Sequence, residues 1–413
     1  MRSTFRKAAV WGGAVVASAL VVGAVAATPF GIAGTSEEAP AVDAAALLEE
    51  AAVIPADEWA ETYPNEYETW SLNSENAETV DYLEEYPYLN TLYAGNAFSK
   101  DYLSARGHAY TLEDVSATLR APALANCLSC KTPTMNALIS SGEVGVYALP
   151  FEDVLALSEE SVGCYSCHAN SGDQLVVTNT FLNDGVGDDV DSIDPSMLAC
   201  GQCHNEYYFD PDTKATMLPH DSIESMSPDA ILAYYDEIGF SDYTDPQTGV
   251  EFIKVQHPEL ETVMGEGFKM VGYTCADCHM GTATDDEGNE YTSHYFTSPL
   301  DNAELLENNC SACHEDLAAE VEAIQTAAEE RTNEIGYKLE TLTNELAAAL
   351  EAGSVSDEDF ATIAQLDREA MFYWDFVFVE NSEGAHNSAL TNDCLDKAEE
   401  RVDEALAMLG VEA

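Results

Sequence analysis

The segment "ANCLSCKTPT", Ala125–Thr134, contains a Cys-x-x-Cys pair followed by lysine, the first of five such pairs in the 413-residue chain. In the other four pairs the next residue is histidine. Ten of the eleven cysteines belong to these pairs, and only Cys394 stands apart. The four histidine motifs are "CYSCH", "CGQCH", "CADCH" and "CSACH", which end at His168, His204, His279 and His314.

Cys-x-x-Cys-His is the attachment signature of haem c, in which two thioethers hold the porphyrin and the histidine ligates its iron. Four copies make this a strong signal, and the lysine motif ending at Lys131 extends it to five haem c groups. The predicted attachment cysteines are Cys127, Cys130, Cys164, Cys167, Cys200, Cys203, Cys275, Cys278, Cys310 and Cys313.

Three other cysteine chemistries explain the pattern less well. A zinc site closes its shell with four ligands and gives no reason for a histidine after each pair. A Cys-x-x-Cys disulfide closes a very short loop and adds little stability. An iron–sulfur cluster does not account for the histidines either.

The single lysine, Lys131, indicates which haem carries out chemistry. An amine must lose its proton before it can ligate iron, and free lysine has a pKa near ~10.4. A simple electron carrier would use a histidine, whereas the axial ligand is a principal control on haem reactivity. The alternative is a degenerate motif.

The spacing of the motifs predicts where a substrate pocket is built. Successive first cysteines lie 35 to 37 residues apart, except for 75 residues between Cys200 and Cys275. That interval contains "CHNEYYFDP" and "FIKVQHPELET".

The N-terminus, residues 1–27, has basic residues, a long apolar run and the small-residue site Ala24–Ala26, which predicts a signal peptide or an uncleaved membrane anchor. We therefore expect an exported protein, periplasmic or at the outer face of the cytoplasmic membrane. Residues 28–58 are predicted to form an acidic, solvated linker.

The charge balance, 15 basic against 76 acidic residues and a formal net charge of −61, makes nucleic acid and anionic membranes unlikely partners. It suits a basic protein partner better.

The predicted fold class is mainly α: a multihaem cytochrome c with short helices and loops around five haems in residues 59–314. Apolar residues at three- and four-residue steps after His314 predict a long helix ending near Gly353, and Ser356 is a candidate N-cap for the next one. Residues 315–413 are thus predicted to form long C-terminal helices. The apolar stripe comprises Leu317, Val321, Ile324, Ala328, Ile335, Leu339, Leu342 and Leu346.

The sequence resembles the pentahaem, ammonia-forming cytochrome c nitrite reductases over about 85% of its length. The resemblance rests on "YPNEYETW", "RGHAY", "CLSCK", "CGQCHNEYYFD", "VQHPE", "CADCHM", "DEGNEYTSH" and "CSACH" in this order. It implies a six-electron reduction of nitrite to ammonium at the Lys131 haem, with four further haems relaying electrons. It also implies a membrane quinol-oxidising multihaem cytochrome as electron donor, and a homodimer formed through the C-terminal helices.

The resemblance implies three pocket residues besides Lys131: Arg120 in "TLR", Tyr207 in "EYYF" and His257 in "QHPE". It also implies a Ca²⁺ site, whose oxygen donors suit a hard cation. Its ligands would be the side chains of Glu206 and Gln256 and the backbone carbonyls of Tyr207 and Lys254. The alternative is that Glu206 pairs with Arg120 or Lys254.

Distal haem ligands are implied in the same way: His294 for the second haem, His108 for the third and His386 for the fourth. The fifth haem departs from the family, because Phe268 stands where a histidine is expected. Met264, Met270 and His220 are the candidate replacements, and a vacant position is the remaining possibility.

The motifs are compatible with two other functions. One is a multihaem reductase of hydroxylamine or sulfite, and the other is a pure electron-transfer cytochrome. The second would have every iron six-coordinate, so the pocket residues Arg120, Tyr207 and His257 argue against it.

Overall fold

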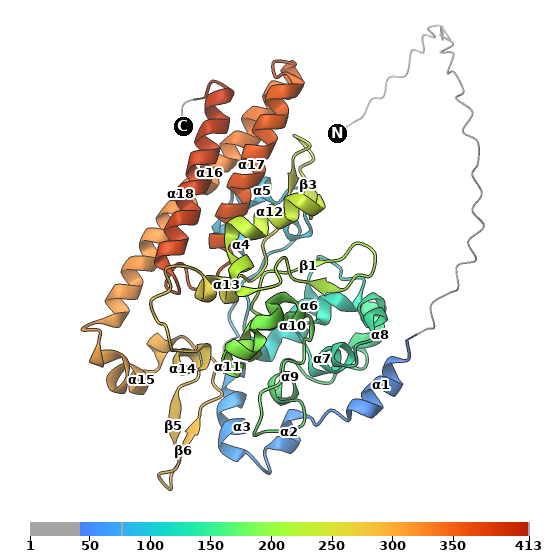
Figure 1. Ribbon diagram of the computed structural model, residues 1–413, viewed down its shortest axis with the longest axis vertical. Coiled ribbons are helices and arrows are strands. Elements are labelled where there is room, and N and C mark those ends of the chain that lie inside the picture. The colour runs from blue at the N-terminus through green and yellow to red at the C-terminus, as the bar shows by residue number, and fades with distance from the viewer. Residues whose placement is uncertain (1–41, 76, 412–413) are drawn as a thin grey trace, which may run out of the picture. The chain divides into compact units, whose positions relative to one another are not determined.

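A computed structural model describes residues 42–75 and 77–411 of the chain (Figure 1). The described part is mainly helical, and short helices dominate up to the fifth haem motif. This confirms the predicted fold class. The helices before the C-terminal bundle are α1 (Ala44–Ala51), α2 (Ala56–Trp59), α3 (Pro64–Ser71), α4 (Tyr82–Glu85), α5 (Leu89–Leu92), α6 (Thr111–Ala117), α7 (Pro133–Ser140), α8 (Phe151–Leu155), α9 (Cys164–His168), α10 (Phe181–Val186), α11 (Pro195–Gly201), α12 (Pro228–Ile238), α13 (Glu259–Met264), α14 (Cys275–His279) and α15 (Ala303–Asn308).

The strands of the described residues form three small antiparallel pairs, each joining neighbours in the chain. They serve as local hairpins within the loops rather than as a sheet core. They are β1 (Tyr208–Phe209) with β2 (Thr216–Met217), β3 (Tyr243–Thr244) with β4 (Glu251–Phe252), and β5 (Thr282–Thr284) with β6 (Glu290–Thr292).

Three long helices, α16 (Leu317–Ala352), α17 (Asp357–Phe378) and α18 (Ser388–Met408), lie side by side as a bundle (Figure 1). Helix α16 ends at Gly353, whose positive φ of 63° suits a residue without a side chain. Ser356 caps α17 by accepting the N–H of Asp359 at 3.1 Å. Both predicted boundaries are confirmed.

The C-terminal half of the apolar stripe on α16, Ile335 to Leu346, is buried within the chain against the aromatic face of α17 and the apolar face of α18. Trp374 of α17 is fully buried and donates its indole N–H to the carbonyl of Thr332 at 2.8 Å. This part of the stripe therefore forms core in one chain and is not itself evidence for a homodimer.

A second apolar core lies beside the first haem motif, around Leu128, Leu138 and Leu182. Helix α1 packs on α7, and its Leu47 and Leu48 contact this core. The expectation of a solvated linker over residues 28–58 is therefore wrong for its described part, residues 42–58. Leu47 and Leu48 are half-buried and hold α1 against this core, although the surrounding composition is acidic.

Residues 1–27, predicted to be a signal peptide or anchor, lie outside the described residues. Among the residues that are described, no helix is long and apolar enough to cross a membrane.

Candidate active site

A cavity of about 2680 Å³ runs through the region before the helical bundle. All ten cysteines of the five motifs line it. Sites for a single ligand usually measure about 300–1,000 Å³, so this cavity accommodates several large groups. Its size and its lining fit five porphyrins attached at these motifs. The residue after each pair also faces it: Lys131, His168, His204, His279 and His314.

Local helical structure explains why the motif residues act together. Cys164–His168 forms α9 and Cys275–His279 forms α14. Positions i, i+3 and i+4 share one face of a helix, so both cysteines and the histidine of each motif point to the same side. Thr274 caps α14 through the N–H of Asp277 at 3.4 Å.

The structure pairs three motif histidines with three distant ones. Their ring centroids are 6.2 Å apart for His168 and His294, 6.1 Å for His204 and His108, and 5.9 Å for His279 and His386. A metal–imidazole bond is about 2 Å long, so two rings on opposite sides of one metal ion have centroids about 6 Å apart. Each pair is thus spaced to hold one iron.

Hydrogen bonds at Nδ1 orient several of these rings and leave Nε2 as the ligating nitrogen. Nδ1 of His168 lies 2.8 Å from the carbonyl oxygen of Gln174, and Nδ1 of His279 lies 2.9 Å from that of Thr297. Burial, together with nearby His204 and Lys131, lowers the pKa of His108 to about 3. That ring is therefore neutral, as a ligand must be.

A buried polar cluster joins the first three haem motifs. Gln202, inside the third motif, accepts the backbone N–H of Asn179 at 2.8 Å and donates to the carbonyl of Ser166, inside the second, at 3.1 Å. The Asn179 side-chain nitrogen lies 3.3 Å from Cys203 Sγ and 3.8 Å from Cys130 Sγ. These contacts fix the first three attachment sites relative to one another.

This cluster was not anticipated from the sequence. The sequence offers only a weak signal for it: a polar residue precedes the second cysteine in the first three motifs, namely Ser129, Ser166 and Gln202, which are all buried, but the fourth motif also has one, the exposed Asp277. The fifth motif has Ala312 at that position.

The predicted pocket residues Arg120, Tyr207 and His257 line the same cavity as Lys131. The Arg120 guanidinium stacks 4.3 Å from the ring centroid of Phe98, and its Nε donates to Thr118 Oγ1 at 2.8 Å. Burial raises the pKa of Tyr207, and the neighbouring Arg120 partly offsets this. The phenol therefore keeps its proton.

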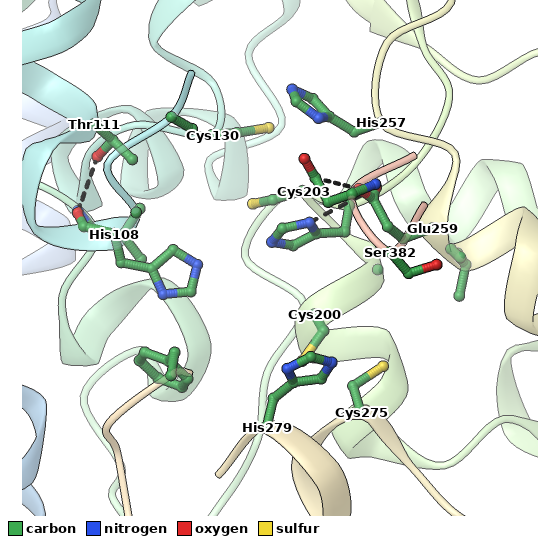
Figure 2. Close-up of a pocket in the computed structure, with 18 of the residues that line it drawn as sticks. His108, Thr111, Cys130, Cys200, Cys203, His257, Glu259, Cys275, His279 and Ser382 are labelled. Atoms are coloured by element: carbon green, nitrogen blue, oxygen red, sulfur yellow. Dashed lines mark hydrogen bonds and ion pairs between the residues drawn. The ribbon is translucent and has the colours of Figure 1, made fainter. Parts of the chain in front are cut away.

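Figure 2 shows His257 beside the third motif, with Cys130 and Cys203 facing the same space. Burial lowers the pKa of His257 to about 4, with Glu259 opposing the shift and Lys131 adding to it.

Glu259, two residues later, was not assigned a role from the sequence, although it belongs to "QHPE". Its Oε2 lies 3.8 Å from Nδ1 of His204. Burial alone would raise its pKa, but the interaction with His204 lowers it to about 2. Glu259 is therefore an anionic partner behind the third motif's histidine.

The residues predicted to hold calcium lie together. The Glu206 carboxylate is fully buried and accepts the N–H of Gln256 at 2.6 Å and the hydroxyl of Tyr235 at 2.9 Å. The Gln256 side-chain amide lies 2.7 Å from the carbonyl oxygen of Lys254. Three of the four expected donors thus meet at one place.

Neither basic residue offered as an alternative partner neutralises Glu206. The Lys254 ammonium lies 3.1 Å from Asp375 Oδ2, and Arg120 lies 3.6 Å from Asp101 Oδ1. Burial raises the pKa of Glu206 well above its usual range. A buried carboxylate that has no cationic side chain beside it fits a bound hard cation, because the ion would supply the missing positive charge. Within the described residues no three His, Cys, Asp or Glu side chains cluster as a metal site, so carbonyl and amide oxygens would complete the shell.

Two candidate ligands for the fifth haem, His220 and Met264, do not line the cavity. His220 is buried, with Nδ1 2.6 Å from the carbonyl oxygen of Gly185 and Nε2 2.9 Å from Glu261 Oε1. Met264, at the end of α13, packs against the second core.

Cys394 is buried in α18, and none of the eleven cysteines, all within the described residues, forms a disulfide.

Residues 55–412 match the sequence model of the cytochrome c552 family. A similar solved structure is the catalytic subunit of cytochrome c nitrite reductase from Desulfovibrio desulfuricans ATCC 27774, which is described with two calcium sites. It has 25% sequence identity and a TM-score of 0.76, over 86% of this chain and 85% of that one.

Weaker similarities lead to two larger cytochromes. The outer cell wall cytochrome OcwA has a TM-score of 0.40 at 20% identity, over 72% of this chain and 48% of that one. The undecahaem cytochrome from the S-layer of Carboxydothermus ferrireducens has a TM-score of 0.37 at 18% identity, over 73% and 41%.

The five attachment motifs around one shared cavity define a multihaem c-type cytochrome. Because the family match spans most of the chain, the protein belongs to the cytochrome c552 family. This confirms the resemblance to the pentahaem nitrite reductases, the enzyme class that it implied, and covalently bound haem c as cofactor.

Proposed function

We propose that this protein reduces nitrite to ammonium at the haem held by Cys127, Cys130 and Lys131. One nitrite takes up six electrons and eight protons and yields one ammonium ion and two water molecules. The observation that carries this proposal is that the one lysine motif shares its cavity with Arg120 and His257.

The haem bound there would supply the iron that takes nitrite and receives electrons. Arg120 provides a fixed positive charge for the anion. Its ion pair with Asp101 at 3.6 Å offsets this charge only in part, because Asp101 also accepts the N–H of Leu119 at 2.7 Å. Tyr207 holds its proton and can donate a hydrogen bond to a substrate oxygen. His257 offers a second polar group to the departing water.

The three histidine pairs are proposed as the axial ligands of the second, third and fourth haems. The placement of the motifs suggests the route of the electrons. The Asn179 side chain reaches the sulfurs of both Cys130 in the first motif and Cys203 in the third, and α11 with Cys200 of the third motif packs on α14 with Cys275 of the fourth (Figure 2). Electrons would therefore pass from the fourth motif through the third to the Lys131 haem.

We propose that Glu206, Gln256 and the carbonyl oxygens of Tyr207 and Lys254 bind Ca²⁺. The ion would fix the backbone at Tyr207, which supplies both a ligand and a pocket side chain. Glu261 supports the same backbone by accepting the N–H of Glu206 at 3.0 Å.

Removing calcium should therefore destabilise the protein. A ligand at 100 times its Kd contributes about 2.7 kcal/mol to folding, which for a chain of this size corresponds to a Tm shift of about 3 °C. We expect a calcium chelator to lower Tm by that amount and to reduce nitrite turnover, with both restored by added Ca²⁺. Glu206→Gln should be insensitive to the chelator, and Glu340→Gln, on α16, should behave as the parent. A parent Tm unchanged after verified calcium removal would contradict the site.

Export to the periplasm or the outer membrane face, a quinol-oxidising membrane cytochrome as donor, and a homodimer through the C-terminal helices remain proposals. The family resemblance supports each of them, and the basic residues ahead of the N-terminal apolar run support export.

Net charge should oppose substrate approach, because a surface at −61 repels an anion. The Debye length falls from about 30 Å at 0.01 M salt to about 8 Å at 0.15 M, whereas a desolvated pocket is screened less. With a small uncharged electron donor, kcat/KM for nitrite should therefore rise between these concentrations. A steady fall would show that a positive channel, rather than net charge, controls access.

Nitrite turnover with a reduced dye as donor tests the proposed function, with hydroxylamine and sulfite assayed in parallel. We expect nitrite to give the highest kcat/KM. A higher kcat/KM for sulfite or hydroxylamine would reassign the substrate. A ferric spectrum without any high-spin haem would indicate an electron conduit.

A further inference from the structure

Histidine placement leaves the fifth haem motif without a partner ring. Six of the nine histidines, all of which lie in the described residues, form the three pairs. His220 has both ring nitrogens engaged in the core. His257 lines the same cavity as Lys131 and has its ring centroid 6.4 Å from that of His204. His314 therefore has no second histidine opposite it.

The loop of residues 265–274 lines the cavity between α13 and α14. Asn387 holds this loop, because its side-chain nitrogen donates to the carbonyl of Glu266 at 3.2 Å. Ser382, five residues before Asn387, accepts from Gln325 of α16 at 3.2 Å. Segment 382–387 thus connects the loop to the start of α16, close to the fifth motif.

Two side chains of this loop are relevant to an iron at His314. Phe268 is half-buried and lines the cavity, and a phenyl ring cannot ligate iron. Met270 also lines the cavity, but it is 40% exposed and begins a turn in which its carbonyl accepts the N–H of Tyr273 at 3.0 Å. Neighbouring Val271 is 83% exposed and lines the same cavity. Met270 belongs to neither apolar core of the described residues, so packing does not hold its thioether in one position.

The proximal side of this motif also differs from those of the second and fourth motifs. Nδ1 of His314 lies 2.8 Å from the Glu320 carboxylate, whereas His168 and His279 face backbone carbonyls; the third motif's His204 has a carboxylate only at 3.8 Å, that of Glu259. A carboxylate partner makes the imidazole a more basic ligand, which enriches the iron in electrons. An electron-rich ferrous iron favours ligands that accept electron density.

We propose that the haem held by Cys310, Cys313 and His314 has an open distal position and is a second ligand-binding site. Its ligands would be small neutral diatomic molecules that accept electron density, such as carbon monoxide or nitric oxide. Phe268 provides an apolar cover, and the net charge of −61 disfavours anions. The inference rests on the axial pairs proposed above but not on nitrite as substrate.

Carbon monoxide titration of the reduced holoprotein tests this directly. The parent should bind two molecules per chain, one at the Lys131 haem and one at the fifth haem. Phe268→His should lower the number of bound molecules to one per chain, because a histidine at this position can occupy the open coordination position of the iron. Met270→Ala should remain at two.

One molecule per chain in the parent would overturn the proposal. So would a rise from one to two on Met270→Ala, since Met270 would then be the sixth ligand. If Phe268→His does not fold, low-temperature electron paramagnetic resonance of the ferric parent decides: two high-spin haems support the open site and one contradicts it. Nitrite turnover is measured separately, so its failure would leave the count of ligand-binding haems intact.

Discussion

Replacing Arg120 with alanine is expected to lower kcat/KM for nitrite by roughly 100- to 1,000-fold, as when one preorganised electrostatic contact is lost from an active site. The guanidinium is held by Thr118 and by the Phe98 ring, and its one carboxylate neighbour in the described structure lies 3.6 Å away. Its charge is therefore only partly offset and can still attract an anion. Steady-state kinetics with a reduced dye as donor would measure the loss.

Arg106→Ala is the matched control. Arg106 lines the same cavity, but its guanidinium donates to Glu113 at 3.0 Å and also contacts Asp114. Its charge is therefore already neutralised, and we expect turnover close to that of the parent. Equal losses in the two variants would show that Arg120 contributes only to the electrostatic potential of the cavity and does not bind nitrite directly.

The second large effect is expected for Lys131→His. Both thioethers remain, so the haem should stay covalently attached, but its proximal ligand changes from an amine to an imidazole. Changing even the partner of a metal ligand typically costs about 10- to 100-fold in activity, so we expect kcat to fall at least that much. The spectrum of the high-spin haem assigned to this motif should shift as well.

Mass spectrometry of the intact Lys131→His chain verifies that five haems are present. Lys100→His, at an exposed position outside the cavity lining, serves as the control and should leave kcat unchanged. Parent rates in a fully loaded Lys131→His variant would mean that the lysine motif is a degenerate form with no chemical role.

Local patterns predicted much of the fold and the cofactors. Haem attachment depends on five consecutive residues, and the helix boundaries at Gly353 and Ser356 depend on local capping, so each is visible in sequence. Haem ligands that lie far apart in the sequence cannot be paired from local patterns. His168 and His294 are separated by 126 positions and were paired only through the family resemblance.

Other features depend on packing that no local pattern reveals. Asn179 contacts sulfurs of two motifs only because the third motif folds back on the first. The linker prediction failed at α1 for the same reason, since an acidic composition does not show that Leu47 and Leu48 find an apolar surface. The buried position of His220 likewise removed it as a ligand candidate, which its sequence position could not do.

For the calcium ligands too, the resemblance predicted the residues, but only the structure showed their partners. Glu206 and Gln256 were chosen through the resemblance, with a salt bridge to Lys254 as the alternative. The structure gives Lys254 another partner, Asp375 on α17, more than a hundred residues away. That long-range ion pair leaves Glu206 without a cationic side chain among the described residues.

The ammonium yield per electron consumed tests the central claim most directly. Reduced dye, nitrite and the five-haem protein are combined, and dye oxidation, nitrite loss and ammonium formation are followed together. The proposed reaction predicts six electrons and one ammonium ion for every nitrite consumed, with no accumulating intermediate. Nitrite loss with fewer electrons and release of nitric oxide, or no nitrite loss at all, would contradict the account.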